Sequence, residues 1–320
     1  MEKLDFYVKG KKKIAIGGHV KPDGDCVGST LAVYNYIKDN YPEITTHIYL
    51  EAIPNIFKFL NRSDEIFNDS FRDDEYDLFI CLDCGDAARL GDNVRYFIDA
   101  KETICVDHHI SNTSFADVNY IVADASSTCE LVYGLLDESK ITKEIAECLY
   151  VGIVHDTGVF QYSCTSSSTM VIAGKLMDMG IDYSTIVDKT FFEKTFEQNQ
   201  ILATALLKAQ RYINNKVIAS IITAAEMKKC NVQPKHLEGI VAQLRSTKDV
   251  DVSIFMYETP KNDIKVSLRS NGAVDVAAIS VKFGGGGHVR AAGITIAGKS
   301  AEDILQDLLD EIKLAYERNN

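Results

Sequence analysis

Acidic and imidazole side chains recur in this sequence directly after short apolar runs. The sharpest case is Asp107-His108-His109, which follows the apolar run 103–106. The other cases are His19, Asp23 and Asp25 after the run 14–18, Asp83, Asp86 and Arg89 after the run 78–82, and His155 and Asp156 after the run 151–154. One pattern repeated four times indicates that these side chains share a site.

The chemistry of these side chains points to bound cations. In an open parallel sheet the carboxyl ends of the strands form the ligand crevice, so side chains that follow several strands can converge there. Carboxylates a few ångströms apart oppose one another's ionisation, and divalent cations resolve that conflict. Mixed Asp and His ligation suits octahedral Mn²⁺ or a similar ion. The pattern therefore predicts a two-metal hydrolytic site.

The first of these runs leads into the first candidate ligands. Asp23 and Asp25 stand on either side of Gly24, so both can point into one cavity and serve adjacent cations. An isolated Pro-Asp-Gly-Asp tetrapeptide would be a commonplace turn. The position of His19, four residues ahead of Asp23 and directly after a predicted strand, favours metal binding instead.

Asp83 ends the most apolar predicted strand, 78–82. A single carboxylate between two cations about 3.5–4 Å apart is an economical bridge, which makes Asp83 a predicted catalytic residue. Asp86 fits better as a helix N-cap. Arg89 can clamp a phosphate bidentately or pair with a neighbouring carboxylate, and the sequence does not choose between these interpretations.

The Asp107-His108-His109 segment offers one imidazole as a ligand, an adjacent carboxylate that can orient it, and a second imidazole that is free to meet the substrate or leaving group. Asp156 supplies a further metal carboxylate, whereas His155 is a candidate for a packed neighbour. A buried His pair with purely structural hydrogen bonds is the alternative, and the accompanying carboxylates disfavour it.

A glycine run, Gly284–Gly287, precedes His288 in the second half of the chain. Consecutive glycines let backbone N–H groups approach an anionic oxygen closely. Linker glycines are usually longer runs rich in Ser, whereas predicted helix and strand segments flank this run. The predicted phosphate-binding or base-binding residues are therefore Gly285, Gly286, Gly287, His288 and Arg269.

Hydrophobic periodicity predicts an α/β protein, since residues 1–185 alternate short apolar runs with amphipathic stretches as a mostly parallel sheet does. The predicted strands of this part are 13–18, 46–51, 78–82 and 103–106, with a weaker one at 94–98, and the predicted helices are 25–39, 127–138, 142–155 and 166–179. The later strands are predicted at 217–222, 251–257, 264–269 and 294–296, with helices after Pro234, over 274–283 and at the C-terminus. We predict a catalytic domain, 1–187, a helical linker, 188–210, and a smaller α/β substrate-binding domain, 211–320.

Composition narrows the function classes. No apolar run approaches the roughly 20 residues of a membrane span, and the N-terminus lacks a signal-peptide core, so we expect a cytoplasmic protein. The eight scattered cysteines predict reduced, buried thiols rather than a disulfide framework. The net charge is −12, but residues 211–320 hold 15 Lys and Arg against 13 Asp and Glu, while residues 1–210 hold 19 against 33. An acidic metal-binding half joined to a mildly basic half fits a small phosphorylated ligand and does not fit a long duplex nucleic acid.

Five ordered motifs resemble those of the DHH family of phosphoesterases. They are H-V-K-P-D-G-D at 19–25, L-D-C-G-D at 82–86, D-H-H at 107–109, H-D-T-G at 155–158, and G-G-G-H…A-A-G at 285–293. The resemblance covers nearly the whole chain and implies two lobes with the active site in the cleft between them. One departure is an extra glycine in the run before His288.

The resemblance also implies roles for individual residues. One cation would be held by His19, Asp23 and Asp83, and the other by Asp25, Asp83, His108 and Asp156. Asp107 would orient a neighbouring side chain without binding a cation itself, and His109 would face the substrate phosphate. The metal typical of the family is Mn²⁺.

The two-domain layout is similar to that of bacterial nano-RNases that also dephosphorylate 3′-phosphoadenosine 5′-phosphate (pAp). The resemblance implies hydrolysis of RNA or DNA oligonucleotides of two to about five residues, a limit that stacking and phosphate contacts can enforce, plus phosphate removal from pAp. A phosphodiesterase for linear pApA in cyclic-di-AMP turnover and an inorganic pyrophosphatase are the enzyme alternatives, and the glycine run disfavours the second. A non-catalytic nucleotide-binding module is disfavoured because every ligand position is filled. An exposed apolar face on the catalytic domain could support a homodimer.

Overall fold

The computed structural model describes residues 2–68 and 75–319. The chain divides into two compact units, Met1–Glu193 and Lys194–Asn320. The predicted linker, 188–210, contains the helix α8 (Phe196–Lys208). Because Ile201 and Ala205 of this helix are buried with strand residues of the second unit, α8 belongs to that unit's core.

Five parallel strands form the sheet of the first unit, in the order β2-β1-β3-β4-β5. They are β1 (Lys13–Gly17), β2 (Thr45–Tyr49), β3 (Leu78–Leu82), β4 (Thr103–Asp107) and β5 (Val118–Ile121). The strand order reverses direction between β1 and β3, and such a switch point opens a crevice at the carboxyl ends of the two strands. The predicted α/β class with a mostly parallel sheet is confirmed.

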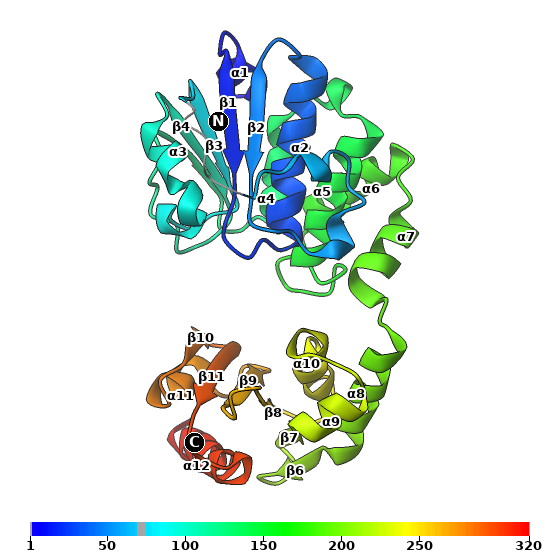
Figure 1. Cartoon of the computed structure of the whole chain (residues 1–320), viewed down its shortest axis with the longest axis vertical. Coiled ribbons are helices and arrows are strands. Elements are labelled where there is room, and N and C mark those ends of the chain that lie inside the picture. The colour runs from blue at the N-terminus through cyan, green and yellow to red at the C-terminus, as the bar shows by residue number, and fades with distance from the viewer. Residues whose placement is uncertain (1, 69–74, 320) are drawn as a thin grey trace. The chain divides into compact units, whose positions relative to one another are not determined.

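Helices cover both faces of this sheet, so each face has its own core. In β1, Ile14 and Ile16 pack on one side and Ala15 on the other, as the two-residue repeat of a strand requires. The first side carries α2 (Gly24–Asn40), α4 (Thr128–Leu135) and α5 (Lys143–Asp156), and the second carries α3 (Val94–Asp99) (Figure 1). The other helices of this unit are α1 (Leu4–Val8), α6 (Ser167–Asp178), α7 (Tyr183–Val187) and the π-helical turn η5 (Asp188–Phe192), with 3₁₀ turns η1 (Asn55–Phe57), η2 (Ser63–Glu65), η3 (Ala87–Asn93) and η4 (Glu138–Lys140).

The structure corrects two parts of the sequence prediction in this unit. The weak strand predicted at 94–98 is wrong, because these residues form α3. Their aromatic and β-branched types resemble a strand, but Tyr96 and Phe97 are both buried while Ile98 is 70% exposed, as on a helix. The sequence does not predict β5, because its half-buried side chains form no apolar run. The four predicted helices are present within a few residues.

The second unit contains a mixed sheet in the order β10-β11-β9-β8-β7-β6, in which only β7 and β8 are parallel. Its strands are β6 (Gln210–Tyr212), β7 (Val217–Ile222), β8 (Val252–Glu258), β9 (Ile264–Ser270), β10 (Gly286–His288) and β11 (Ala291–Ile296). One face packs against α11 (Val276–Lys282) and α12 (Ala301–Asn319), and the other against α8, α9 (Ala224–Lys229), η6 (Pro234–Leu237) and α10 (Ile240–Arg245). The sequence does not predict the short elements β6, β10 and α9, because three to six residues are too few to show a period of apolar side chains.

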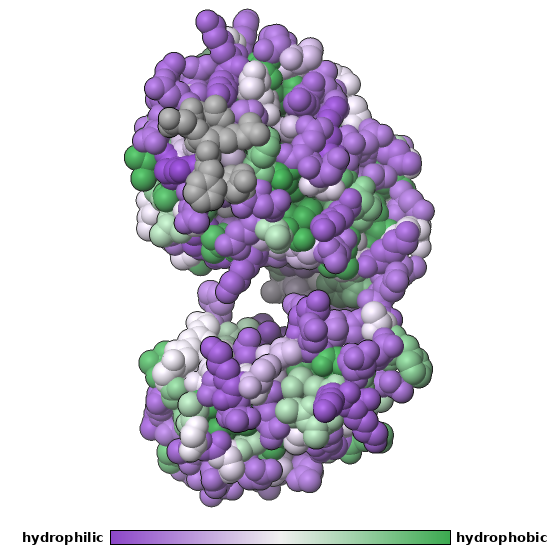
Figure 2. Space-filling view, viewed as in Figure 1, coloured by the Kyte–Doolittle hydropathy of each residue, from purple (hydrophilic) through white to green (hydrophobic). Residues whose placement is uncertain are grey.

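The surface of each unit is largely hydrophilic on the face that Figure 2 shows. Among the described residues, no helix has the length and apolar character that crossing a membrane would require. Of the eight cysteines, none forms a disulfide, and six are buried, as the sequence predicts.

The first unit depends on a close approach of α2 to α5. Gly28 of α2 lies against the backbone of α5, and a Cβ at this position would stand 2.4 Å from the Cys148 carbonyl oxygen. A backbone atom cannot move aside as a flexible side chain can. The contact therefore requires glycine at position 28.

We expect Gly28→Ala to lower the free energy of unfolding by about 1–3 kcal/mol, because it overpacks this contact. Gly174 in α6 is the matched control, since no described atom lies within 4 Å of a Cβ built there. Gly174→Ala should raise the free energy of unfolding by about 0.5–1 kcal/mol. Urea unfolding followed by circular dichroism measures both, and equal stability of the two variants would contradict the packing argument.

Candidate metal centre

The candidate ligands gather at the carboxyl ends of β1, β3 and β4, three neighbouring strands. His19 follows β1, Asp83 follows β3, and His108 and His109 follow β4. The site therefore lies at the β1/β3 switch point, where an open α/β sheet places its ligand crevice. The fourth run is different, because Asp156 is the last residue of a helix, α5. Its carboxylate lies 3.0 Å from His108 Nε2 and so belongs to the same site.

His19 is almost fully buried, and one ring nitrogen is already occupied. Its Nδ1–H donates to the carbonyl oxygen of Val20 at 2.9 Å, so the neutral imidazole has a lone pair on Nε2. Nε2 lies 3.4 Å from Asp83 Oδ2 and 3.6 Å from Asp23 Oδ2. Burial opposes protonation, but the two carboxylates raise the pKa of His19 above its ordinary value. The imidazole therefore requires a cation or a second proton at Nε2.

Asp83 stands at the centre of the cluster, and its two oxygens face different partners. Oδ2 faces His19, whereas Oδ1 lies 3.7 Å from His108 Nε2 and accepts a hydrogen bond from Thr128 Oγ1 at 3.1 Å. Its backbone is left-handed, with φ +54°, a conformation that Asp tolerates better than most residues. This arrangement suits a carboxylate that bridges two cations, and the bridging role of Asp83 stays a prediction.

His108 repeats the arrangement of His19. Its Nδ1–H points to the carbonyl oxygen of Ala125 at 3.3 Å. Its Nε2 lies 3.0 Å from Asp156 Oδ2, 3.7 Å from Asp83 Oδ1 and 3.9 Å from Asp25 Oδ2. Although burial opposes protonation, these carboxylates raise the pKa of His108 to about 10. Without a cation, His108 Nε2 therefore carries a proton at neutral pH, and a bound cation would take the place of that proton among the carboxylates.

Asp25 is fully buried and is held by the N-terminal end of α4. Its two oxygens accept from the backbone N–H groups of Thr128 and Cys129 at 2.6 and 2.9 Å. The positive end of a helix favours a negative charge at this place. Burial and the nearby carboxylates of Asp83 and Asp156 nevertheless raise the pKa of Asp25 well above its ordinary value. The helix end therefore offsets only part of the cost of a charged Asp25.

Asp107 and His109 form a hydrogen-bonded pair beside these ligands, and His109 Nδ1 also lies 3.6 Å from Asp83 Oδ1. Asp107 Oδ1 accepts from His109 Nδ1 at 2.7 Å, and Oδ2 accepts from Asn112 Nδ2 at 2.7 Å. The same Asn112 amide donates to the carbonyl oxygen of Cys84 at 3.0 Å, which ties the loop after β4 to the loop after β3. The pair thus turns His109 Nε2 away from Asp107, and a third of the His109 side chain is exposed.

The arrangement fits divalent cations. Two donor atoms on one cation lie about 3–3.5 Å apart, because metal–ligand bonds of about 2.1 Å meet at roughly right angles. The imidazole–carboxylate distances of 3.0 to 3.9 Å are close to that spacing. Three compact donor groups occur among the described residues: His19, Cys26 and Asp83; Asp83, His108 and His109; and Asp25, His108 and Asp156.

The structure adds detail at Asp23 and agrees with the sequence interpretation of His155. Asp23 caps α2, because its Oδ1 accepts from the backbone N–H groups of Asp25 and Cys26. Only Asp23 Oδ2, at 3.6 Å from His19, remains free to bind a cation. His155 is a packed neighbour: its ring fills the space beside Gly24, where a Cβ would stand 2.4 Å from it. Burial lowers the pKa of His155 to about 4, so its ring is neutral.

Cys26, Asn112 and Thr128 also lie in this site, although no motif of the sequence predicts them. Cys26 is fully buried beside His19, and burial raises the pKa of its thiol to about 12. Thr128 follows Ser126 and Ser127, a hydroxyl-rich turn whose position before a predicted helix could have suggested an N-terminal contact with a carboxylate. Asn112 carries no such local signal, because its partners lie on two different loops.

Arg89 and the predicted substrate-binding residues of the second unit do not belong to the three donor groups. Arg89 is exposed in η3, where Asp86 is the N-cap as predicted, and it pairs with no carboxylate among the described residues. Gly286 to His288 form β10, and Arg269 lies in β9. The N–H of Gly285 donates to the Ser280 carbonyl oxygen at 2.9 Å, so this group is engaged within its own unit. The predicted substrate contacts of these residues remain predictions.

Comparison with known proteins agrees with the fold and the motifs. Residues 13–153 match the DHH family, N-terminal domain, and residues 209–315 match the DHHA1 domain. The two matches together cover most of the chain, which carries a DHH domain followed by a C-terminal DHHA1 domain. The resemblance drawn from the sequence is confirmed.

Similar proteins span the same two domains. The chain is 27% identical over 316 residues to the probable bifunctional oligoribonuclease and PAP phosphatase NrnA of Streptococcus mutans, covering 96% of this chain and 97% of that protein. It is 28% identical over 303 residues to the bifunctional oligoribonuclease and PAP phosphatase NrnA of Bacillus subtilis, covering 92% and 93%. The crystal structure of an exopolyphosphatase-related protein from Bacteroides fragilis superposes with a TM-score of 0.89 at 27% identity, covering 98% and 96%.

We expect Asp83→Asn to raise the Kd of both bound cations by more than about 10-fold. The reason is that the variant removes the negative charge that lies beside both His19 and His108. Calorimetric titration of the whole chain with Mn²⁺ measures this, and two ions should bind the unchanged chain. The control is Asp86→Ser, which keeps an oxygen for the N-cap of η3. Two ions bound to Asp83→Asn with unchanged affinity would refute the bridge.

Proposed function

We propose that this chain is a two-metal phosphoesterase that hydrolyses short oligonucleotides to mononucleotides and removes the 3′ phosphate of pAp. The observation that carries the proposal is Asp83, whose two carboxylate oxygens face the metal-directed nitrogens of His19 and His108. The names of the similar proteins from Streptococcus mutans and Bacillus subtilis supply the substrates.

We further propose Mn²⁺ as the native ion. His19, Asp23 and Asp83 would hold one cation, and Asp25, Asp83, His108 and Asp156 the other. When bound, the two cations stabilise the charge that develops on the phosphate oxygens during hydrolysis. Carboxylate-rich sites with imidazole ligands suit Mn²⁺ among the divalent ions.

His109 is the proposed group that meets the substrate. Asp107 accepts from Nδ1, and this hydrogen bond, with burial opposing it, raises the pKa of His109. The hydrogen bond fixes the ring so that a proton on Nε2 points away from the Asp107 carboxylate. From that position His109 can donate to a phosphate oxygen or to the leaving oxygen. Asn112 holds Asp107 and so positions His109 indirectly.

The second unit is proposed to bind the terminal nucleotide. His288 is exposed on β10, and the space beside Gly286 of the same strand is open, since no described atom lies within 4 Å of a Cβ built there. An exposed imidazole can stack on a base or donate to a phosphate. Arg269 and Arg89 are the proposed sources of further positive charge, since a guanidinium binds phosphate bidentately.

A side-by-side assay tests the function. The purified chain with Mn²⁺ is given pApA, a five-residue RNA, pAp and pyrophosphate, and we expect AMP from pApA and pAp, mononucleotides from the RNA, and no cleavage of pyrophosphate. Activity confined to pApA would instead indicate turnover of a linear dinucleotide second messenger. Cleavage of pyrophosphate alone would contradict the proposed role of the second unit.

We expect His288→Ala to raise KM for pApA by about 10-fold or more, the effect of losing about 1–3 kcal/mol of base stacking. Cleavage of bis-p-nitrophenyl phosphate, which lacks a base, should change little. Val289→Ala is the matched control, because Val289 is exposed at the neighbouring position. Equal losses on both substrates would remove the recognition role of His288.

A further inference from the structure

One short segment, 125–129, contacts three of the proposed metal ligands at once. Two backbone N–H groups at its end donate to the two oxygens of Asp25. The Thr128 hydroxyl donates to Asp83 Oδ1, and a carbonyl oxygen at the start of the segment accepts from His108 Nδ1. The position of this segment therefore determines how the three ligands face one another.

The carboxylate of Glu130, which directly follows the 125–129 segment, holds that segment in place. Its Oε2 accepts from both the backbone N–H and the hydroxyl of Ser126. The same carboxylate accepts from the Ser168 hydroxyl at 2.7 Å and from the Thr169 hydroxyl at 2.8 Å, both in the first turn of α6. Glu130 thus joins the 125–129 segment to α6.

The α6 end of this contact leads back to a fourth ligand, Asp156. A loop connects Asp156 to α6, and the Cys164 thiol near the end of that loop donates to the Asp156 carbonyl oxygen at 3.6 Å. Glu130 therefore joins the segment that contacts Asp25 and His108 to the segment that follows Asp156. Asp25, His108 and Asp156 are the members of one compact donor group.

Glu130 holds these groups as a buried charge. Its side chain belongs to a residue that is only 9% exposed. In the described part of the chain, its hydrogen bonds come from hydroxyl and backbone N–H groups. Burial opposes the charge, but the hydroxyl donors hold the pKa of Glu130 below its ordinary value, so the carboxylate is ionised at neutral pH. Hydrogen bonds to a charged acceptor are roughly twice as strong as neutral ones, which makes this a firm attachment.

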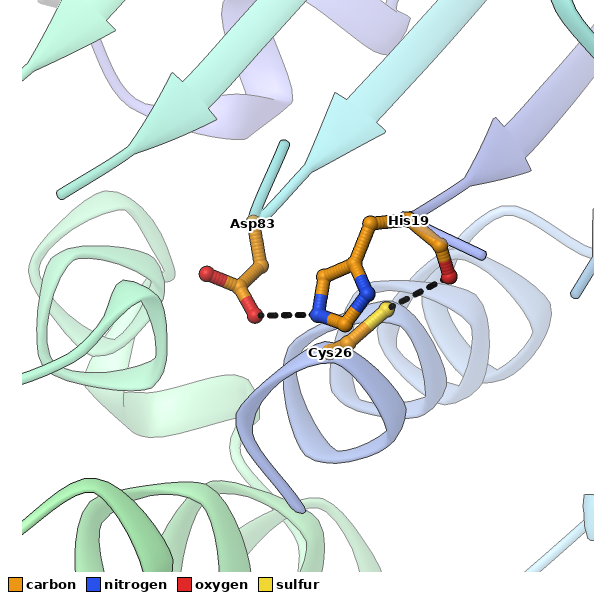
Figure 3. A group of neighbouring side chains, drawn as sticks. All are labelled: His19, Cys26 and Asp83. Atoms are coloured by element: carbon orange, nitrogen blue, oxygen red, sulfur yellow. Dashed lines mark hydrogen bonds and ion pairs between the residues drawn. The ribbon is translucent and has the colours of Figure 1, made fainter. Parts of the chain in front are cut away.

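The cation position beside His19 depends on other contacts. One Asp83 oxygen points at the His19 ring and the other points away from it (Figure 3), and the Thr128 hydroxyl binds the oxygen that does not face His19. Asp23 is held by the N-terminal end of its own helix, α2. Among the described residues, no hydrogen bond joins the 125–129 segment to His19 or Asp23. The attachment through Glu130 thus serves one of the two cation positions.

We propose that Glu130 is a positioning residue for one of the two cations. By fixing the 125–129 segment against α6, its carboxylate sets the spacing of the donor group that contains His108, and it leaves the position beside His19 unaffected. Glu130 itself binds neither the cation nor the substrate. The inference rests on the two-metal site of the proposed function and adds a residue on which only one half of that site depends.

Calorimetric titration of the full-length chain with Mn²⁺ tests the inference without turnover. Residues behind metal ligands typically change metal affinity by about 10- to 100-fold, so we expect Glu130→Ala to raise the Kd of one ion by about 10-fold or more and that of the other by less than about threefold. Electron paramagnetic resonance gives a second readout. Two Mn²⁺ ions that share Asp83 interact magnetically, whereas Glu130→Ala at limiting Mn²⁺ should show the spectrum of an isolated ion.

Paired substitutions identify which position is weakened. In a chain that carries His19→Gln, adding Glu130→Ala should raise the Kd of the remaining ion by about 10-fold or more. In a chain that carries His108→Gln, the same addition should change the Kd of the remaining ion by less than about threefold. The reverse pattern would overturn the inference.

A conservative variant separates position from charge. Glu130→Gln keeps an oxygen that can accept from Ser126, while its NH₂ group can donate to the Ser168 hydroxyl, which also accepts. We expect Glu130→Gln to bind both ions within about threefold of the unchanged chain, because the 125–129 segment stays attached. The matched control is Glu138→Ala, which removes a different contact of α6, the ion pair with Lys175 at 3.0 Å, and should leave both affinities unchanged.

Ser126→Ala covers the case in which Glu130→Ala does not fold, as circular dichroism would show. It removes one of the two hydrogen bonds between Ser126 and Glu130 and should weaken the same ion by about threefold or more.

Equal weakening of both ions, weakening of neither, or equal losses in Glu130→Ala and Glu130→Gln would each overturn the inference. Two bound ions without hydrolysis of any phosphoester would refute the proposed activity and leave this inference standing. Failure of the unchanged chain to bind two ions would refute the two-metal site, and the inference with it.

Discussion

The crowding of buried carboxylates at one end of the first sheet is the constraint on which the rest of the site depends. Asp25 and Asp107 are fully buried and Asp83 is 2% exposed. An uncompensated buried charge costs several kcal/mol, and charges of the same sign add to that cost. The surrounding elements supply what compensation a protein can: the α4 N-terminus for Asp25, and the Asn112 amide for Asp107. Among the described residues, no Lys or Arg pairs with the carboxylates around His19 and His108, and divalent cations can supply the missing positive charge.

The orientation of the imidazoles follows from hydrogen bonds made on the side away from the carboxylates. The carbonyl oxygens of Val20 and Ala125 take the Nδ1–H groups of His19 and His108, which leaves Nε2 as the metal-directed atom in both. Ligating histidines are commonly fixed in this way, because the remote hydrogen bond selects the tautomer. The His109 ring is oriented by the Asp107 carboxylate instead. This difference distinguishes the proposed substrate-facing imidazole from the two proposed metal ligands.

Much of the fold and of the site could be predicted from sequence, because short local patterns of residue types indicate both. Apolar runs of four to five residues mark β1, β3 and β4, and the chemistry-bearing residues directly follow them. What could not be predicted involves contacts between distant segments. The hydroxyl of Thr128 reaches Asp83 across 45 residues of sequence. Likewise, Cys26 stands between Asp25 and Val27 with no local signal of its contacts, and only the fold places its thiol beside His19.

The glycine run of the second unit shows how one sequence signal can have two causes. A Cβ at Gly285 would stand 2.3 Å from the Gly293 carbonyl oxygen, and one at Gly287 would stand 2.4 Å from that of Ala291. The close pairing of β10 with β11 therefore explains these two glycines without any ligand. Anion binding through consecutive N–H groups is then not required to account for the run. The proposed recognition of a nucleotide by this unit would then rest on side chains such as His288, whose imidazole is exposed and which the strand pairing does not require.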